Sequence, residues 1–242
     1  MLKVSIFNFK GGTGKSTTAL NLGASMAGSQ RRVLLIDLDG QRTLSFGLGM
    51  DGDRPTTVDW LTGEGLFSPL PTETKNLSLI PGDIEMFHMR SDQDLFAQAL
   101  ERLEGFFDIV LMDCPPSLSF ASVQAILSSD RVLVPTLCEP ASLKGFSEAV
   151  SLIREERKDM PIEVLRVRYK TKLVLTREAD EMLIDSAVDM NYRLLHTVIP
   201  ENVSVAESIA QQKSVMDYAS SSSGSQAYQS LARECSKIWS VK

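Results

Sequence analysis

The chain has 242 residues, with 25 Lys and Arg against 31 Asp and Glu, so its formal net charge is −6. This balance argues against a surface covered with basic residues, although local clusters still have to be sought. No apolar run approaches the roughly 18 residues of a spanning helix and no leader pattern is present, so we expect a cytoplasmic protein with no membrane partner. The three cysteines form no Cys-x-x-Cys pair, which argues against a disulfide framework or a zinc site.

Apolar runs of strand length alternate with segments of helical period along the whole chain. The expected strands are 4–7, 33–36, 77–80, 109–112, 132–134 and 195–199. The expected helices are 16–27, 93–103, 120–127, 142–154, 177–188 and 226–239. This alternation predicts an α/β fold, a doubly wound and mostly parallel sheet flanked by helices, as one domain over residues 1–242. Ligands bind such sheets at the carboxyl ends of the strands.

A glycine-rich segment lies between the first expected strand and the first expected helix. Such a turn directs backbone N–H groups at one point, where the N-terminus of the helix adds the positive end of its dipole. The segment therefore predicts a polyphosphate site, with Lys15 at the β- and γ-phosphates of ATP and the Ser16 hydroxyl on a bridging Mg²⁺. The binding residues expected here are Lys10, Gly11, Gly12, Thr13, Gly14, Lys15, Ser16 and Thr17.

This loop departs from the usual G-x-x-x-x-G-K-[ST] pattern at its start, where Phe9 replaces glycine and a second lysine, Lys10, follows. Lys15 already supplies the local ammonium group. Lys10 would therefore leave its charge in solvent or meet phosphate from another direction, and the second possibility implies a dimer.

Acidic residues follow two of the expected strands. Asp37 and Asp39 end the second strand and Asp113 ends the fourth, beside the predicted phosphate loop. Asp113 fits a Walker B residue that holds Mg²⁺ directly or through water, and Asp37 could support the metal shell. Asp39 is the residue that we expect to orient or activate the attacking water.

Several segments in order along the chain resemble the ParA/MinD-type ATPases, P-loop NTPases with a deviant Walker A box, K-G-G-x-G-K-[ST]. Asp113–Ser117 is similar to their D-x-P-P-S segment, and residues 134–145 and 198–208 resemble later family patterns. The resemblance implies an ATP-sandwich homodimer in which Lys10 crosses to the partner's nucleotide, a hydrolytic role for Asp39, and an adenine site near Pro200 and Asn202. Gly40 replaces the proline of the family's D-x-D-P-Q pattern.

A basic stretch with no acidic residue is the other unusual feature, in residues 166–177. Strand periodicity would place its first four basic side chains on one side of a strand. Such a row could follow a phosphate backbone, and ParA proteins bind DNA without sequence preference. The alternatives are pairing with Glu155, Glu156 or Glu163, or a contact of Lys170 or Lys172 with nucleotide. The candidate DNA contacts are Arg166, Arg168, Lys170, Lys172 and Arg177.

The resemblance implies a ParA-like ATPase that dimerises on ATP, binds nucleoid DNA and positions a plasmid or chromosome through an adaptor that stimulates hydrolysis. Positioning of a protein assembly such as a carboxysome is the alternative within the family. A MinD-like membrane cycle would need a basic amphipathic tail. The last expected helix has few basic residues, so we expect it to pack on the core. A biosynthetic ligase would need a carboxylate-substrate pocket, for which the sequence offers no motif.

Overall fold

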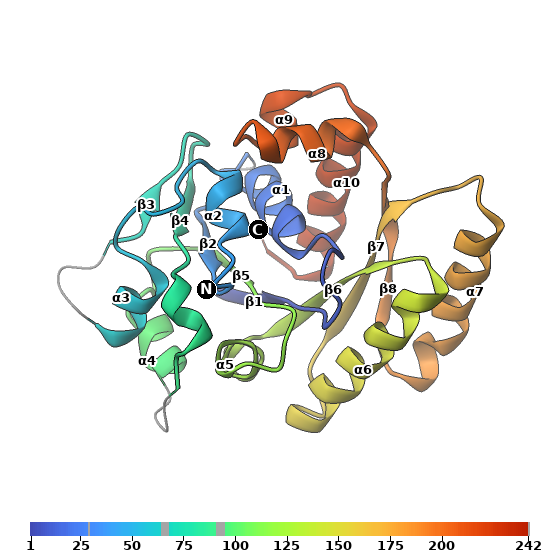
Figure 1. The fold of residues 1–242 in the computed structure, drawn as a ribbon, viewed down its shortest axis with the longest axis horizontal. Helices are drawn as coiled ribbons and strands as arrows, with labels where there is room; N and C mark the ends of the chain where they lie inside the picture. Colours follow the sequence, from blue (N-terminus) through green and yellow to red (C-terminus); the bar gives the residue numbers. More distant parts are fainter. Residues whose placement is uncertain (29, 64–67, 91–94, 242) are drawn as a thin grey trace.

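The computed structural model describes residues 1–28, 30–63, 68–90 and 95–241, and Figure 1 shows one sheet with helices on both faces. The strands are β1 (Leu2–Ile6), β2 (Val33–Asp37), β3 (Leu70–Pro71), β4 (Leu77–Ile80), β5 (Ile109–Asp113), β6 (Arg131–Leu137), β7 (Ile162–Tyr169) and β8 (Arg193–Pro200). Their order in the sheet is β3-β4-β2-β5-β1-β6-β7-β8, and only β3 and β4 pair antiparallel. The predicted doubly wound, mostly parallel sheet is confirmed.

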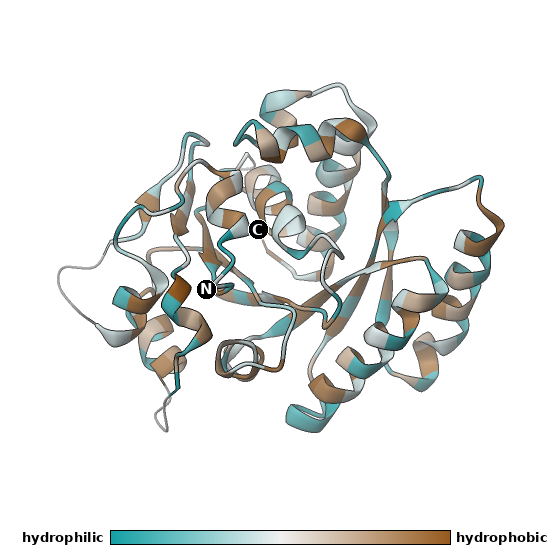
Figure 2. Cartoon of the chain, viewed as in Figure 1, coloured by the Kyte–Doolittle hydropathy of each residue, from teal (hydrophilic) through white to brown (hydrophobic). Residues whose placement is uncertain are grey.

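Helices follow most of the strands. They are α1 (Lys15–Ala27), α2 (Thr43–Gly47), α3 (Thr57–Thr62), the 3-10 helix η1 (Ile84–Phe87), α4 (Leu95–Glu101), α5 (Phe120–Ser128), α6 (Pro140–Glu156), α7 (Val174–Asp189), α8 (Val203–Ala210), α9 (Val215–Tyr218) and α10 (Ser223–Ile238). Figure 2 shows brown and teal stretches alternating along the longer helices, as expected of helices with one face on a core.

Two hydrophobic clusters lie on opposite faces of the sheet. Successive residues of a strand point to opposite faces, so Leu34 and Ile36 of β2 pack in one cluster and Val33 and Leu35 in the other. The first cluster is covered by α3 to α7, and the second by α1, α2, α9 and α10. All five residues of β2 and of β5 are buried, which explains their continuous apolar sequence.

The last helix packs on the core, as the sequence predicts. Tyr228, Leu231, Cys235 and Trp239 are each at most 5% exposed and belong to the cluster beside α1. All three cysteines are buried and free. Among the described residues, no helix is long and apolar enough to cross a membrane.

The structure also differs from the expected elements at several places. The helix expected at 93–103 is α4 within the described residues, and positions 93 and 94 lie outside them. The helix expected at 177–188 begins earlier, at Val174. The short elements β3, α2, α3, α8 and α9 were not expected, because segments of two to eight residues carry too little periodicity to be recognised.

The order of the central strands positions the candidate site. β5 lies between β1 and β2, and Asp113 at its end is in register with Ile6 on one side and Asp37 on the other. The loop after β1 and the two carboxylates therefore meet at the same edge of the sheet, which is where a parallel sheet binds ligands.

Candidate active site

The glycine-rich loop joins β1 to α1. Gly12 and Gly14 both have φ of +74°, a left-handed conformation that glycine adopts without strain. Gly14 is also the residue that caps α1, and no side chain there accepts a hydrogen bond from the first turn. The N–H groups at the start of α1 are thus left for a ligand, which is the arrangement that binds phosphate.

Three hydrogen bonds hold the first half of the loop, one of them to β6 and two within residues 8–13. The buried Asn8 donates its amide to the Pro135 carbonyl at 2.8 Å, and its side-chain oxygen accepts from Lys10 N at 3.1 Å. Thr13 Oγ1 donates to the Lys10 carbonyl at 3.3 Å. Asn8 was missed by the sequence analysis, because its partner is distant in the chain.

Lys15 brings a cation into a buried position. Its side chain is 7% exposed and Nζ donates to the Lys10 carbonyl at 3.3 Å. Burial lowers the pKa of Lys15, and the nearby carboxylates of Asp113 and Asp39 oppose this shift. Such an ammonium group is stabilised further by any anion that enters the loop.

Asp113 is fully buried, and neither of its carboxylate oxygens has a hydrogen-bond partner within normal limits among the described residues. Burial raises the pKa of Asp113 well above its ordinary value, and the nearby charge of Asp37 raises it further. The adjacent Ser16 hydroxyl and Lys15 partly offset that rise. Buried oxygens without partners are rare because desolvation is costly, and they fit a site for a hard cation such as Mg²⁺.

Asp37 is equally buried, but both of its carboxylate oxygens accept hydrogen bonds. Its Oδ2 accepts from the backbone N of Ser45 at 2.9 Å and from the Ser45 hydroxyl at 2.6 Å, and its Oδ1 accepts from Asp39 N at 3.2 Å. Burial raises the pKa of Asp37, although these hydrogen bonds lower it in part. Ser45, which belongs to the unexpected helix α2, is a site residue that the sequence analysis missed.

Asp39 lies in the turn that follows β2 and is 8% exposed. Its Oδ1 accepts from Gln41 N at 2.9 Å, and its carbonyl accepts from Arg42 N at 2.8 Å. Its charge acts on both Lys15 and Asp113. The three carboxylates and the loop lysine therefore form one electrostatic group.

Lys10 lies along α6 in the single chain. Its Nζ donates to Oγ of the buried Ser142 at 2.7 Å, and its Cβ is 3.6 Å from the position that a Cβ on Gly145 would occupy. Ser142 is in the first turn of α6, where the helix dipole disfavours a cation. The crossing of Lys10 to a partner subunit stays a prediction.

A cavity of about 450 Å³ adjoins the loop on the side of β8. Its lining includes Gly14 and Thr17 from the loop and α1, Pro200 and Asn202 from the end of β8 and the residues after it, and Tyr228 from α10. Asn202 caps α8 by accepting from Val205 N at 3.3 Å. The structure thus places the two residues expected near adenine beside the phosphate loop.

The basic stretch does not have the predicted geometry. β7 ends at Tyr169, its pairing with β8 shifts register after Arg166, and Arg168 has φ of +51°. The expectation that four basic side chains share one side of a strand is therefore wrong, since Lys170 and Lys172 lie in the loop beyond it. β7 is also an interior strand, between β6 and β8.

The acidic partners of this stretch differ from Glu155, Glu156 and Glu163, which the sequence analysis offered as an alternative. Arg166, with an 11% exposed side chain, pairs with Asp180 at 2.8 Å, whereas Arg168 and Lys170 pair with Glu201 at 3.0 and 3.5 Å. Glu163 instead pairs with Arg131. Lys172 and Arg177 are exposed. DNA contact by the five basic residues stays a prediction.

Comparisons with known proteins agree with this geometry. A family model described as an AAA domain matches residues 1–164. The chain is 35% identical to the chromosome partitioning protein ParA of Caulobacter vibrioides, over 96% of this chain and 92% of that protein. It is 31% identical to the sporulation initiation inhibitor protein Soj of Bacillus subtilis, over 96% of each. The solved structure of MinD from Pyrococcus horikoshii, complexed with Mg-ADP, has a TM-score of 0.83 at 28% identity and covers 99% of this chain and 98% of that one.

Proposed function

Because the chain belongs to the ParA/MinD-type family of AAA-domain ATPases, we propose that it binds ATP with Mg²⁺ at the loop of residues 10–17 and hydrolyses it. The observation that carries the proposal is the pairing of two costly buried groups at one edge of the sheet. The carboxylate of Asp113 has no hydrogen-bond partner within normal limits among the described residues, and the ammonium group of Lys15 lies within its electrostatic reach. A cation and a polyphosphate would satisfy both groups.

Each loop residue then has a distinct part in binding. The backbone N–H groups of Gly11 to Thr17 bind the phosphate oxygens, and Lys15 adds a positive charge at the β- and γ-phosphates. Ser16 and Asp113 hold Mg²⁺, and Asp37 supports that shell from its fixed position on Ser45. When bound by these residues, Mg²⁺ would supply positive charge to offset the negative charge that develops on the phosphate oxygens.

Asp39 is the proposed catalytic residue. It orients the attacking water toward the γ-phosphate, and no covalent bond to the protein is required, since phosphoryl transfer depends on positioning and charge. The adenine of ATP occupies the cavity between Thr17 and Tyr228, near Pro200 and Asn202.

The wider cycle is proposed from the likeness to ParA. ATP closes a homodimer in which Lys10 leaves Ser142 and meets the phosphates of the partner subunit. The dimer binds nucleoid DNA through Lys172 and Arg177 at least, because the ion pairs of Arg166, Arg168 and Lys170 compete with phosphate. An adaptor protein stimulates hydrolysis, and the cycle positions or segregates a cargo such as a plasmid or chromosome.

One experiment tests the nucleotide and DNA parts together. Binding to duplex DNA of arbitrary sequence is measured with ATP, with ADP and without nucleotide, at two salt concentrations, for the wild-type protein and for Lys15→Ala. We expect salt-sensitive binding that requires ATP and is absent in the variant. DNA binding that is equal in all three nucleotide states would contradict the proposed cycle. ATP hydrolysis, measured in parallel, would then show whether the ATPase assignment holds even if the DNA-binding cycle does not.

A further inference from the structure

Gly40, the residue after Asp39, has no room for a side chain, and this lack of space, not its backbone conformation, is what favours glycine there. Gly40 is not among the residues with positive φ, so its backbone does not lie in the left-handed region that favours glycine. A Cβ on Gly40 would, however, lie 2.6 Å from both Cδ2 and Cε2 of Phe87 and 2.9 Å from Cζ. Carbon atoms in van der Waals contact are about 3.5–4.0 Å apart, so the ring already occupies the place of a side chain.

The turn beneath that ring determines where the Asp39 carboxylate lies. Asp39 N donates to Asp37, and Gln41 N donates to Asp39 Oδ1, so the chain on each side of Gly40 is hydrogen-bonded. Gly40 itself is the residue of the turn whose backbone can adopt the widest range of conformations. A group that restricts Gly40 therefore restricts the carboxylate next to it.

Phe87 is supported from the same edge of the sheet. It ends η1, whose first turn is capped by Asp83, and Asp83 accepts from Thr56 Oγ1 at 2.9 Å. The preceding Gly82 N donates to Ser45 Oγ at 2.9 Å, and Ser45 is the residue that holds Asp37. The ring is thus attached through η1 to the same hydrogen-bonded group as the turn.

Core packing does not account for Phe87. Its side chain is 45% exposed, and neither hydrophobic cluster of the described residues includes it. An aromatic ring that is half in solvent and half against a glycine contributes little to the core, so its contact with the turn is what requires explanation.

We propose that Phe87 is a positioning residue for the Asp39 turn, in that its ring lies on Gly40 and keeps the Asp39 carboxylate in place for hydrolysis. The proposal rests on the proposed ATPase function and adds a residue outside the phosphate loop and the strand ends. Phe87 does not touch the nucleotide in this assignment. It acts on the rate of hydrolysis through Gly40 and leaves nucleotide binding to the loop.

The test is a cycle of four proteins: wild type, Gly40→Ala, Phe87→Ala and the double variant, each assayed for kcat, KM and ATP binding. We expect Phe87→Ala to lower kcat about tenfold with KM changed by less than about twofold, because misplacement of one catalytic group is costly. Gly40→Ala should lower kcat similarly, since its Cβ displaces the ring. In the double variant the added methyl group fits the vacated space, so kcat should equal that of Phe87→Ala.

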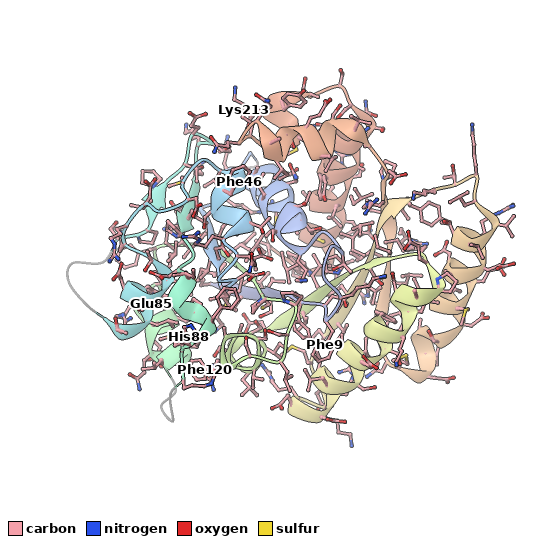
Figure 3. All side chains as sticks on the ribbon, in the orientation of Figure 1. Phe9, Phe46, Glu85, His88, Phe120 and Lys213 are labelled. Atoms are coloured by element: carbon pink, nitrogen blue, oxygen red, sulfur yellow. The ribbon has the colours of Figure 1, made fainter. Side chains whose placement is uncertain are left out.

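Phe46→Ala is the matched control. Phe46 is on α2 and is also 45% exposed. Figure 3 shows it away from Glu85 of η1 and from His88, the residue that follows η1. Phe46→Ala should retain wild-type kcat and KM.

Two further measurements complete the test. Thermal unfolding of each variant identifies any loss of activity that comes from misfolding. Phe87→Leu keeps an apolar side chain over Gly40, so its kcat should be close to that of wild type.

The outcomes separate the two proposals. Wild-type kcat in Phe87→Ala, or reductions by the two single substitutions that multiply in the double variant, would overturn the role of Phe87. If wild-type protein hydrolyses ATP no faster than Asp39→Ala, the proposed role of Asp39 is wrong. Hydrolysis that depends on Asp39 but not on Phe87 would retain the proposed function and reject this inference alone.

Discussion

Asp37 and Asp113 end neighbouring strands in register with one another, and both are fully buried, yet their surroundings differ. Asp37 accepts three hydrogen bonds, whereas Asp113 accepts none within normal limits among the described residues. The first carboxylate stabilises the fold around it and the second is costly in the absence of a ligand. Equal burial therefore does not mean an equal role, and hydrogen-bond partners distinguish a supporting carboxylate from a ligand-binding one.

The largest effect expected from this comparison is on hydrolysis. Asp113→Asn removes the charge that would hold Mg²⁺ and leaves the shape of the side chain nearly unchanged. We expect kcat for ATP to decrease at least about 100-fold, a loss typical of removing one preorganised charged group. Steady-state hydrolysis over a range of Mg²⁺ concentrations measures it, and circular dichroism controls for folding. Turnover within a few-fold of wild type would exclude Asp113 from the metal site.

The same substitution at Asp37 should act on stability. In Asp37→Asn, the new side chain would present an NH₂ group to donors of Ser45 or Asp39, so at least one buried donor would lose its acceptor. We expect the free energy of unfolding to decrease by about 1–3 kcal/mol. Urea unfolding of Asp37→Asn beside Asp113→Asn checks this result. A greater loss of stability in Asp113→Asn would reverse the comparison.

Ser45→Ala is a smaller change at the same carboxylate. It removes the 2.6 Å hydrogen bond to Asp37 and the acceptor of Gly82 N, while the backbone N of Ser45 still donates to Asp37. The expected loss is about 1–2 kcal/mol in the free energy of unfolding. Ser25→Ala, at a position on α1 remote from the carboxylates, is a matched control that should be near neutral.

The smallest effect concerns pH. Burial raises the pKa of Asp113 and of Asp37 in the folded state, so the folded protein binds more protons than the unfolded chain. The stabilising effect of these protons is present at low pH and is lost as pH rises through the folded pKa values. As pH rises from 5 to 8, the free energy of unfolding of Asp113→Asn should therefore increase by about 1 kcal/mol relative to that of wild type. Urea unfolding at each pH measures this difference. A relative loss with rising pH would contradict the raised pKa.

Much of the site could be predicted because its residues follow strands. Lys15 and Ser16 lie in a glycine-rich turn between a strand and a helix, and Asp37 and Asp113 directly follow apolar runs, so adjacency in sequence fixes their place at the edge of the sheet. Ser45 and Phe87 could not be predicted in the same way. Their contacts with Asp37 and Gly40 depend on how α2 and η1 return to the sheet, and such short elements have no clear period.

The geometry of the basic stretch, residues 166–177, could not be predicted from the sequence. A period of two predicts facing directions only while a strand continues in register, and the pairing of β7 with β8 shifts register on both sides of Arg166. Asp180 and Glu201, the observed partners, belong to α7 and to the segment after β8, so their positions depend on the packing of the whole edge. Charge patterning alone contains no information on such pairs.

The place of α10 has a consequence for biosynthesis. Tyr228 of α10 forms part of the cavity beside Gly14 and Thr17, although the loop is translated more than two hundred residues earlier. The chain is synthesised from its N-terminus, so the phosphate loop leaves the ribosome well before α10 does. A nascent chain that already has the phosphate loop therefore still has an open wall at the proposed adenine site. We expect stable retention of nucleotide only after α10 has emerged and docked.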